Sequence, residues 1–143
     1  MSKARSRARR MAMQGLYEWQ VAENDPLDVY HTYQNEHDLK KVDEEYFKEL
    51  MLGVPAKLQE LDKALASHLS RPIKEIDPVE LAILRLACFE LMFRADVPYR
   101  VVINEAIELA KTFGAEAGHK FINGILDKVS IDVRPTEVKR KKN

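Results

Sequence analysis

The chain lacks several features that would define other classes of protein. Its 143 residues include one cysteine, so no internal disulfide can form, and nothing points to an oxidising compartment. No apolar run approaches the roughly 18 residues that a membrane span requires. The basic amino terminus is followed neither by an apolar core nor by a small-residue cleavage site, which excludes a secretory signal. These absences predict a cytoplasmic protein with no membrane partner.

Glycine and proline are also scarce, with five and six residues, and no stretch alternates as a half-buried strand does. Apolar residues recur at helical spacing instead, which predicts an all-α fold: a helical bundle of about seven helices. A kink or break is expected near Gly53–Pro55, because proline removes a backbone hydrogen bond. After Asp132 the chain should be a polar basic tail. The predicted helices cover about 8–21, a segment from Asp25-Pro26, 43–54, 58–69, 78–93, 98–113 and 115–129. Asp43 is a plausible N-cap, and Asp77-Pro78-Val79-Glu80 has the acceptor, first-turn proline and third-position glutamate of a helix start.

The segment 81–93 is apolar nearly all round, as is typical of the buried centre of a bundle. Cys88 lies within it and is expected to be a small core residue rather than a nucleophile. Glu105 and Glu108, which alternate with the apolar stripe of the next helix, are expected to lie on a solvated face. No phosphate-binding loop, dinucleotide fingerprint or nucleophile elbow is present. The sequence therefore indicates a protein that is not an enzyme and that needs no cofactor.

A metal site is also disfavoured by the spacing of candidate ligands. Glu116 and His119 share the i, i+3 spacing of one half of a di-metal carboxylate site. Such a site needs a second Glu-x-x-His from another helix, and no other glutamate here has a histidine three residues on. We therefore predict no metal.

The formal net charge is zero, but the charges are unevenly distributed. Residues 1–20 carry five cations and one acid, which gives +4, whereas residues 21–62 carry eleven acids and four lysines, which gives −7. The remainder sums to +3, with a basic cluster at the end of the chain. An uneven distribution of charge along the chain is more informative about binding partners than the net charge is.

The first ten residues form a basic arm that contains Lys3, Arg5, Arg7, Arg9 and Arg10. Arginine matches phosphate geometry with a two-pronged guanidinium and stacks on bases, and single-stranded RNA exposes both groups. Further along, Gln14, Tyr17 and Gln20 follow at helical spacing and could supply stacking and base-edge contacts. Two alternatives remain: a flexible solubilising terminus, or a helix that lies on a membrane surface. The second needs bulky apolar residues facing lipid, whereas Leu16 and Trp19 are needed for the core.

Several motifs together resemble the NusB family of bacterial transcription antitermination factors, over essentially the whole chain. The block from Val97-Pro98-Tyr99 to Asn123-Gly124-Ile125-Leu126-Asp127 is the most specific part of the resemblance. Ser6 interrupts what is often a continuous arginine run in this family. The block from Val97 to Asp127 contains Ile103-Asn104-Glu105-Ala106 and Phe113-Gly114, and the motifs outside it are Arg5-x-Arg7-Ala8-Arg9, Leu16-Tyr17-x-Trp19-Gln20, Arg85 and Glu90-Leu91.

The resemblance implies two packed helical subdomains in a single RNA-binding domain over 1–143, with a basic arm at 1–10 and a basic tail at 134–143. It implies binding of the single-stranded boxA element of nascent RNA, together with the ribosomal protein NusE, in an RNA polymerase complex that reads through terminators, notably in ribosomal RNA operons. By the same resemblance, Glu80 and Leu84 belong to the partner surface. The implied RNA contacts are Arg5, Arg7, Arg9, Tyr17, Gln20, Phe113 and Phe121, although periodicity alone would bury both phenylalanines.

Two other functions are compatible with the helical pattern. NusB-like bundles also occur as docking domains of RNA methyltransferases, but these need an attached α/β domain, for which we expect 143 residues to leave no room. A protein-only scaffold would recruit partners through the acidic segment 21–62. The sequence leaves open whether the chain is a monomer or a homodimer.

Overall fold

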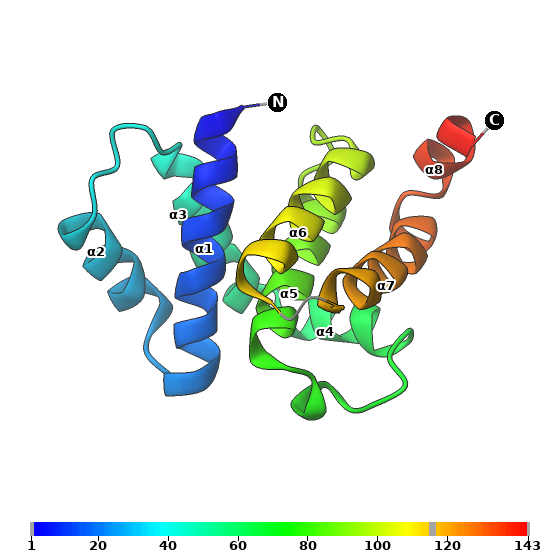
Figure 1. The fold of residues 1–143 in the computed structure, drawn as a ribbon, viewed down its shortest axis with the longest axis horizontal. Helices are drawn as coiled ribbons and strands as arrows, with labels where there is room; N and C mark the ends of the chain where they lie inside the picture. The colour runs from blue at the N-terminus through cyan, green and yellow to red at the C-terminus, as the bar shows by residue number, and fades with distance from the viewer. Residues whose placement is uncertain (1, 115–116, 143) are drawn as a thin grey trace.

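A computed structural model describes residues 2–114 and 117–142, and within these ranges the chain is all-helical (Figure 1). The described residues form eight α-helices and one 3₁₀ helix without any strand, which confirms the all-α prediction and its count to within one helix. The elements are α1 (Lys3–Ala22), α2 (Pro26–Glu36), α3 (Glu44–Ala56), α4 (Leu58–Ala66), η1 (Ile73–Glu75), α5 (Pro78–Phe93), α6 (Tyr99–Phe113), α7 (Gly118–Val133) and α8 (Pro135–Lys142).

Three helices begin at aspartates that the sequence indicated. The carboxylate of Asp25 accepts hydrogen bonds from the amides of Leu27 and Asp28, and Asp77 caps α5 in the same way. Asp43 accepts from the amide of Tyr46 at the start of α3. An N-cap carboxylate satisfies backbone donors that lack a partner in the first turn, so these boundaries are set locally.

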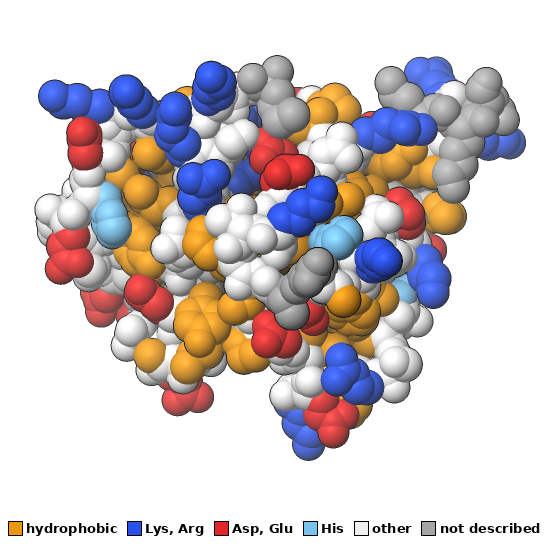
Figure 2. Space-filling model, in the orientation of Figure 1, with side chains coloured by type: hydrophobic (Ala, Val, Ile, Leu, Met, Phe, Trp, Pro, Cys, Tyr) orange, Lys and Arg blue, Asp and Glu red, His pale blue; other side chains and the backbone are white. Residues whose placement is uncertain are grey.

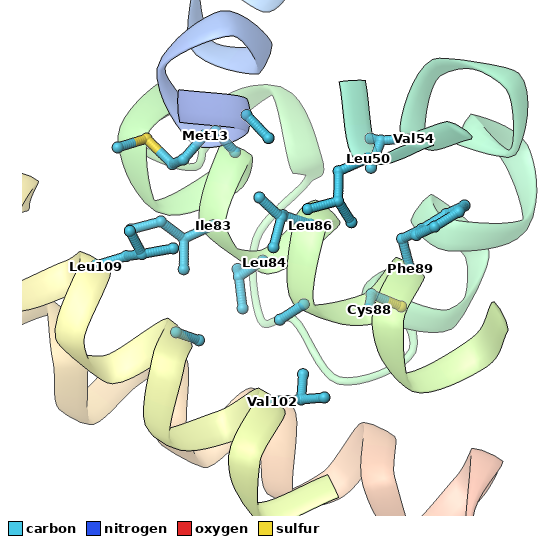
Figure 3. Packing of buried hydrophobic residues seen from close by; sticks show 14 of the residues in the cluster. Met13, Leu50, Val54, Ile83, Leu84, Leu86, Cys88, Phe89, Val102 and Leu109 are labelled. Carbon is cyan, nitrogen blue, oxygen red and sulfur yellow. The ribbon is translucent and has the colours of Figure 1, made fainter. Parts of the chain in front are cut away.

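The centre of the bundle is α5. Residues 81–91 are all buried, and Figure 3 shows Ile83, Leu84 and Leu86 among core side chains of other helices. On one side α5 packs against α1 and α3, which with α2 form the first subdomain; on the other it packs against α4, α6 and α7. Cys88 is fully buried, as expected. The two predicted subdomains therefore share one hydrophobic core.

The kink or break expected near Gly53–Pro55 is present as a break between two helices, but it lies slightly later in the chain. Pro55 occupies the last turn of α3, and α4 begins after Lys57, whose amide bonds to the carbonyl of Gly53 at 3.0 Å. The predicted start of the last long helix at Ala115 lies outside the described residues, and α7 runs four residues beyond the predicted end at Val129.

The predicted polar tail is instead a helix, and this prediction was wrong for residues 134–142. Arg134 is buried, and its guanidinium donates hydrogen bonds to the carbonyls of Leu91 and Glu90 at 3.0 Å and of Arg94 at 2.8 Å. Val138 is also buried, at 5 % exposure. The basic composition of 134–143 is that of a solvated tail. The hydrogen bonds that bury Arg134 are made with backbone carbonyls far away in the sequence, so the local sequence does not reveal them.

Candidate nucleic-acid interface

The basic arm forms the first turns of α1, so helical geometry divides its cations between two faces. Positions i, i+4, i+7, i+11 and i+14 share one face of a helix. The exposed residues of α1 on this face, here called the outward stripe, are Lys3, Arg7, Arg10, Gln14 and Tyr17. Lysine and arginine side chains gather along the edge of the molecule at which α1 begins (Figure 2). The outward stripe thus carries cations at one end and an amide and an aromatic ring at the other.

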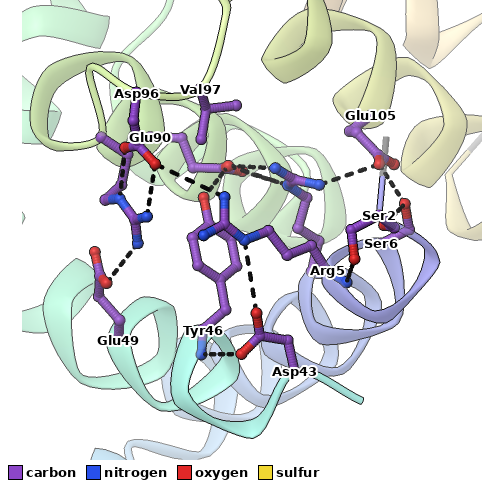
Figure 4. A network of polar contacts seen from close by, with 12 residues as sticks. Ser2, Arg5, Ser6, Asp43, Tyr46, Glu49, Glu90, Asp96, Val97 and Glu105 are labelled. Atoms are coloured by element: carbon purple, nitrogen blue, oxygen red, sulfur yellow. Dashed lines mark hydrogen bonds and ion pairs between the residues drawn. The ribbon is translucent and has the colours of Figure 1, made fainter. Parts of the chain in front are cut away.

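Arg9 lies on the opposite face and is 2 % exposed. Its guanidinium donates to both carboxylate oxygens of Glu90 at 2.9–3.0 Å and to Glu105 at 3.1 Å. The hydroxyls of Tyr46 and Ser6 donate to Glu90 and Glu105, respectively (Figure 4). Burial, with the charge of Glu90, raises the pKa of Tyr46 above its ordinary value, so the phenol stays protonated and donates.

Two expectations change because of this network. Arg9 is too buried to contact RNA, and its hydrogen bonds connect α1 to α5 and α6 instead. Glu105, expected on a solvated face, is buried at 8 % exposure. Arg5 is intermediate: it is half-buried, lies 4.4 Å from the centroid of the Tyr46 ring, and pairs with Asp43 at 3.6 Å. Local patterns in the sequence do not reveal these partners, because Glu90 is 81 residues from Arg9.

Tyr17 and Phe113, which the resemblance grouped together, do lie together in space. Both line a cleft of about 310 Å³ between α1, α2 and the adjoining ends of α5 and α6, with Gln14, Tyr33 and Val79 among the other lining residues. Tyr17 is 37 % exposed, and Phe113 is half-buried against the core. Aromatic rings at the mouth of a cleft provide a surface on which a nucleobase can stack. The cleft continues the outward stripe beyond Gln14.

Gln20 and Phe121 are placed elsewhere. The amide of Gln20 donates to the carbonyl of Pro78 at 2.9 Å and accepts from Arg85 at 3.0 Å, so it joins α1 to α5. Arg85 is itself buried and holds Asp62 through two bonds of 2.9 Å. Phe121 is half-buried and packs against the core from α7, and it does not line the Tyr17 cleft.

The two residues assigned to the partner surface differ in accessibility. Glu80 is half-buried, and a Cβ at Gly118 would lie 2.6 Å from its Oε2, so its carboxylate sits against the start of α7. Burial raises the pKa of Glu80. Leu84 is fully buried and offers no side-chain surface to a partner protein.

Residues 2–114 and 117–142 contain no group of three His, Cys, Asp or Glu side chains placed to hold a metal ion. Glu116 of the Glu-x-x-His pair lies outside the described residues. None of the helices in these two ranges is long and apolar enough to cross a membrane.

The family model of the NusB family matches residues 6–130. The chain belongs to the NusB family. The transcription antitermination protein NusB of Nitrosococcus oceani is 55 % identical over 139 residues, which cover 96 % of this chain and 92 % of that protein. The NusB of Shewanella amazonensis is 58 % identical over 125 residues, covering 87 % and 93 % of the two chains. The resemblance is thus confirmed, and both relatives are transcription antitermination proteins.

Solved NusB structures share the fold. T. maritima NusB is 28 % identical, with a TM-score of 0.83 over 97 % of this chain and 99 % of that chain. A structure of the antitermination factors NusB and NusE in complex with double-stranded RNA gives a TM-score of 0.81 at 27 % identity, over 92 % and 99 % of the chains. The NusB of that structure is thus seen with NusE, as the resemblance implied, and with RNA in double-stranded form.

Proposed function

We propose that this chain is a transcription antitermination factor that binds the single-stranded boxA element of nascent transcripts, notably of ribosomal RNA operons. It acts with a NusE-type ribosomal protein within an RNA polymerase complex that reads through terminators. The observation that carries the proposal is the outward stripe of α1, where Lys3, Arg7 and Arg10 lead along one helix face to Tyr17. The place of action is the cytoplasm, where such transcripts are made.

The two ends of the outward stripe would bind different parts of the RNA. The cations neutralise phosphates, which contributes affinity without selecting a sequence. At the other end, the cleft between Tyr17 and Phe113 accepts an unpaired base, and the amide of Gln14 lies beside it. A single strand offers both an accessible backbone and unstacked bases, whereas a duplex hides its base faces. This arrangement favours single-stranded RNA.

The partner protein would bind near the start of α5, on the side of Glu80. Val79, the neighbour of Glu80, lines the same cleft as Tyr17, so protein and RNA would meet at adjacent surfaces. Each ligand would then increase the affinity for the other through direct contact, a coupling that is reciprocal by linkage. The chain alone would then bind RNA with modest affinity, and it would bind more tightly with the partner present.

Fluorescence anisotropy with a labelled boxA RNA, over a salt series and with or without NusE, tests the proposal. The logarithm of affinity should fall by roughly 0.7 per logarithm of salt for each phosphate neutralised. The variant Arg7→Ala/Arg10→Ala should lose affinity and salt dependence, whereas Lys63→Ala/Lys74→Ala, two exposed cations in α4 and η1, should retain both. Equal binding by both variants would contradict the proposal. A NusE complex indifferent to RNA would favour the protein-only scaffold.

A further inference from the structure

Two lysines from the acidic segment of the chain lie beside the basic arm. Lys40 and Lys41 are exposed in the connection between α2 and α3. The guanidinium of Arg7 donates to the backbone carbonyl of Lys41 at 3.3 Å, and the amide of Asp43 donates to the carbonyl of Ala4 at 3.1 Å. This connection is therefore fastened to the first turns of α1, although 34 residues separate Arg7 from Lys41.

Two acids that flank these lysines in the sequence, Asp38 and Asp43, have other hydrogen-bond partners. Asp38 accepts a hydrogen bond from the backbone amide of Lys40, and Asp43 caps α3 while pairing with Arg5. In the part of the chain that the structure describes, no carboxylate forms an ion pair with Arg7, Lys40 or Lys41. Like charges within a Debye length, about 8 Å at physiological salt, repel one another. Such a cluster fits a surface that binds a polyanion.

We propose that Lys40 and Lys41 extend the RNA-binding surface, so that the RNA backbone runs from the outward stripe across the connection between α2 and α3. This inference rests on the proposed function. The two lysines contact phosphates of nucleotides beyond those at the Tyr17 cleft, because they adjoin Arg7 at the opposite end of the stripe from Tyr17. They contribute affinity and salt dependence and do not select the bases.

The test compares Lys40→Ala/Lys41→Ala with wild type and with Lys63→Ala/Lys74→Ala, by anisotropy with boxA RNA of two lengths. One RNA is the minimal element, and the other carries several additional nucleotides at each end. The salt slope for the longer RNA should fall by about 0.7 for each lysine lost. The minimal RNA should be affected less, and Lys40→Arg/Lys41→Arg should retain the wild-type slope. Both side chains are exposed, and circular dichroism checks that the fold is kept.

The outcomes separate this inference from the proposed function. If Lys40→Ala/Lys41→Ala keeps the wild-type slope with the longer RNA while Arg7→Ala/Arg10→Ala loses it, the extension is wrong and the proposed function stands. If the lysine variant loses binding of NusE but not of RNA, the surface belongs to the protein partner, and the extension is again wrong. If wild type binds neither RNA in a salt-dependent manner, both proposals are wrong.

Discussion

Arg9 and Glu90 form a buried ion pair in which the guanidinium nitrogens Nε and Nη2 lie 2.9–3.0 Å from the carboxylate oxygens, with the side chains 2 % and 1 % exposed. A buried charge is tolerated when it is paired and its other hydrogen bonds are satisfied. Glu105 and Tyr46 complete this requirement around the pair. One arginine of the basic arm therefore joins α1 to α5 and α6, while Arg7 and Arg10 are exposed.

Arg9→Ala should lower the free energy of unfolding by about 3–5 kcal/mol, because it leaves Glu90 buried without its cation. Arg10→Ala changes the adjacent arginine, which is exposed, and should alter stability by no more than about 0.5 kcal/mol. Urea denaturation followed by circular dichroism measures both. Equal unfolding midpoints for the two variants would show that the network does not stabilise the fold.

Tyr17→Ala should weaken boxA RNA binding by about 1–3 kcal/mol, the contribution of one base stacked on an aromatic ring. Tyr17→Phe keeps the ring and should bind nearly as wild type does. Val21→Ala, one turn further along the same exposed face, is the matched control and should leave affinity unchanged. Anisotropy at constant salt gives the three values. Loss of affinity in Tyr17→Phe equal to that in Tyr17→Ala would assign the effect to the hydroxyl instead of the ring.

Asp96 should contribute to stability in a pH-dependent way. The hydrogen bonds donated by Arg94 lower the pKa of Asp96 to about 2, below the value of about 3.9 for an unfolded chain. Because the folded-state pKa is lowered, the stabilisation is complete above the unfolded pKa and is lost as pH falls towards 2. Wild type should therefore exceed Asp96→Asn in unfolding midpoint at pH 5, with the difference shrinking by pH 2. A difference that is constant with pH would contradict the assignment.

Arg134→Ala should release α8 from the bundle. The substitution leaves the carbonyl of Leu91 without its Arg134 donor, whereas the carbonyl of Glu90 keeps the backbone amide of Arg94. A buried polar group without a partner costs about 1–3 kcal/mol. Amide hydrogen exchange in residues 135–142 should accelerate while exchange in α5 stays slow. Lys139→Ala, an exposed change in α8, should leave both unchanged. Unaltered protection of α8 in Arg134→Ala would refute this role.

Cys88 should report on global unfolding. Burial raises the pKa of its thiol to about 12, so the reactive thiolate is scarce at pH 8 and the side chain is fully buried. Labelling by a thiol reagent should be slow in the folded protein and should accelerate through the urea transition. Rapid labelling without denaturant would show that the core opens locally around α5.

Features governed by neighbouring residues were predicted well from the sequence. The caps at Asp25, Asp43 and Asp77 and the buried centre at 81–91 depend on side chains within a few positions of each other. Assignments that depend on distant partners were less successful. Glu105 was expected to be exposed to solvent because it alternates with the apolar residues of its helix. It is buried instead, where it accepts a hydrogen bond from Arg9, 96 residues away.

By itself, the sequence determined the helices up to α7, the family and the presence of a basic arm, because periodicity, capping and motifs are properties of short segments. Only the tertiary structure decided which cations of that arm face outward. Helical geometry separates Arg7 and Arg10 from Arg9, but the inward face is chosen by the carboxylates that α5 and α6 bring to it. The same folding sets Lys41 beside Arg7. A buried charge requires a partner, and a distant segment supplies that partner only after the chain has folded.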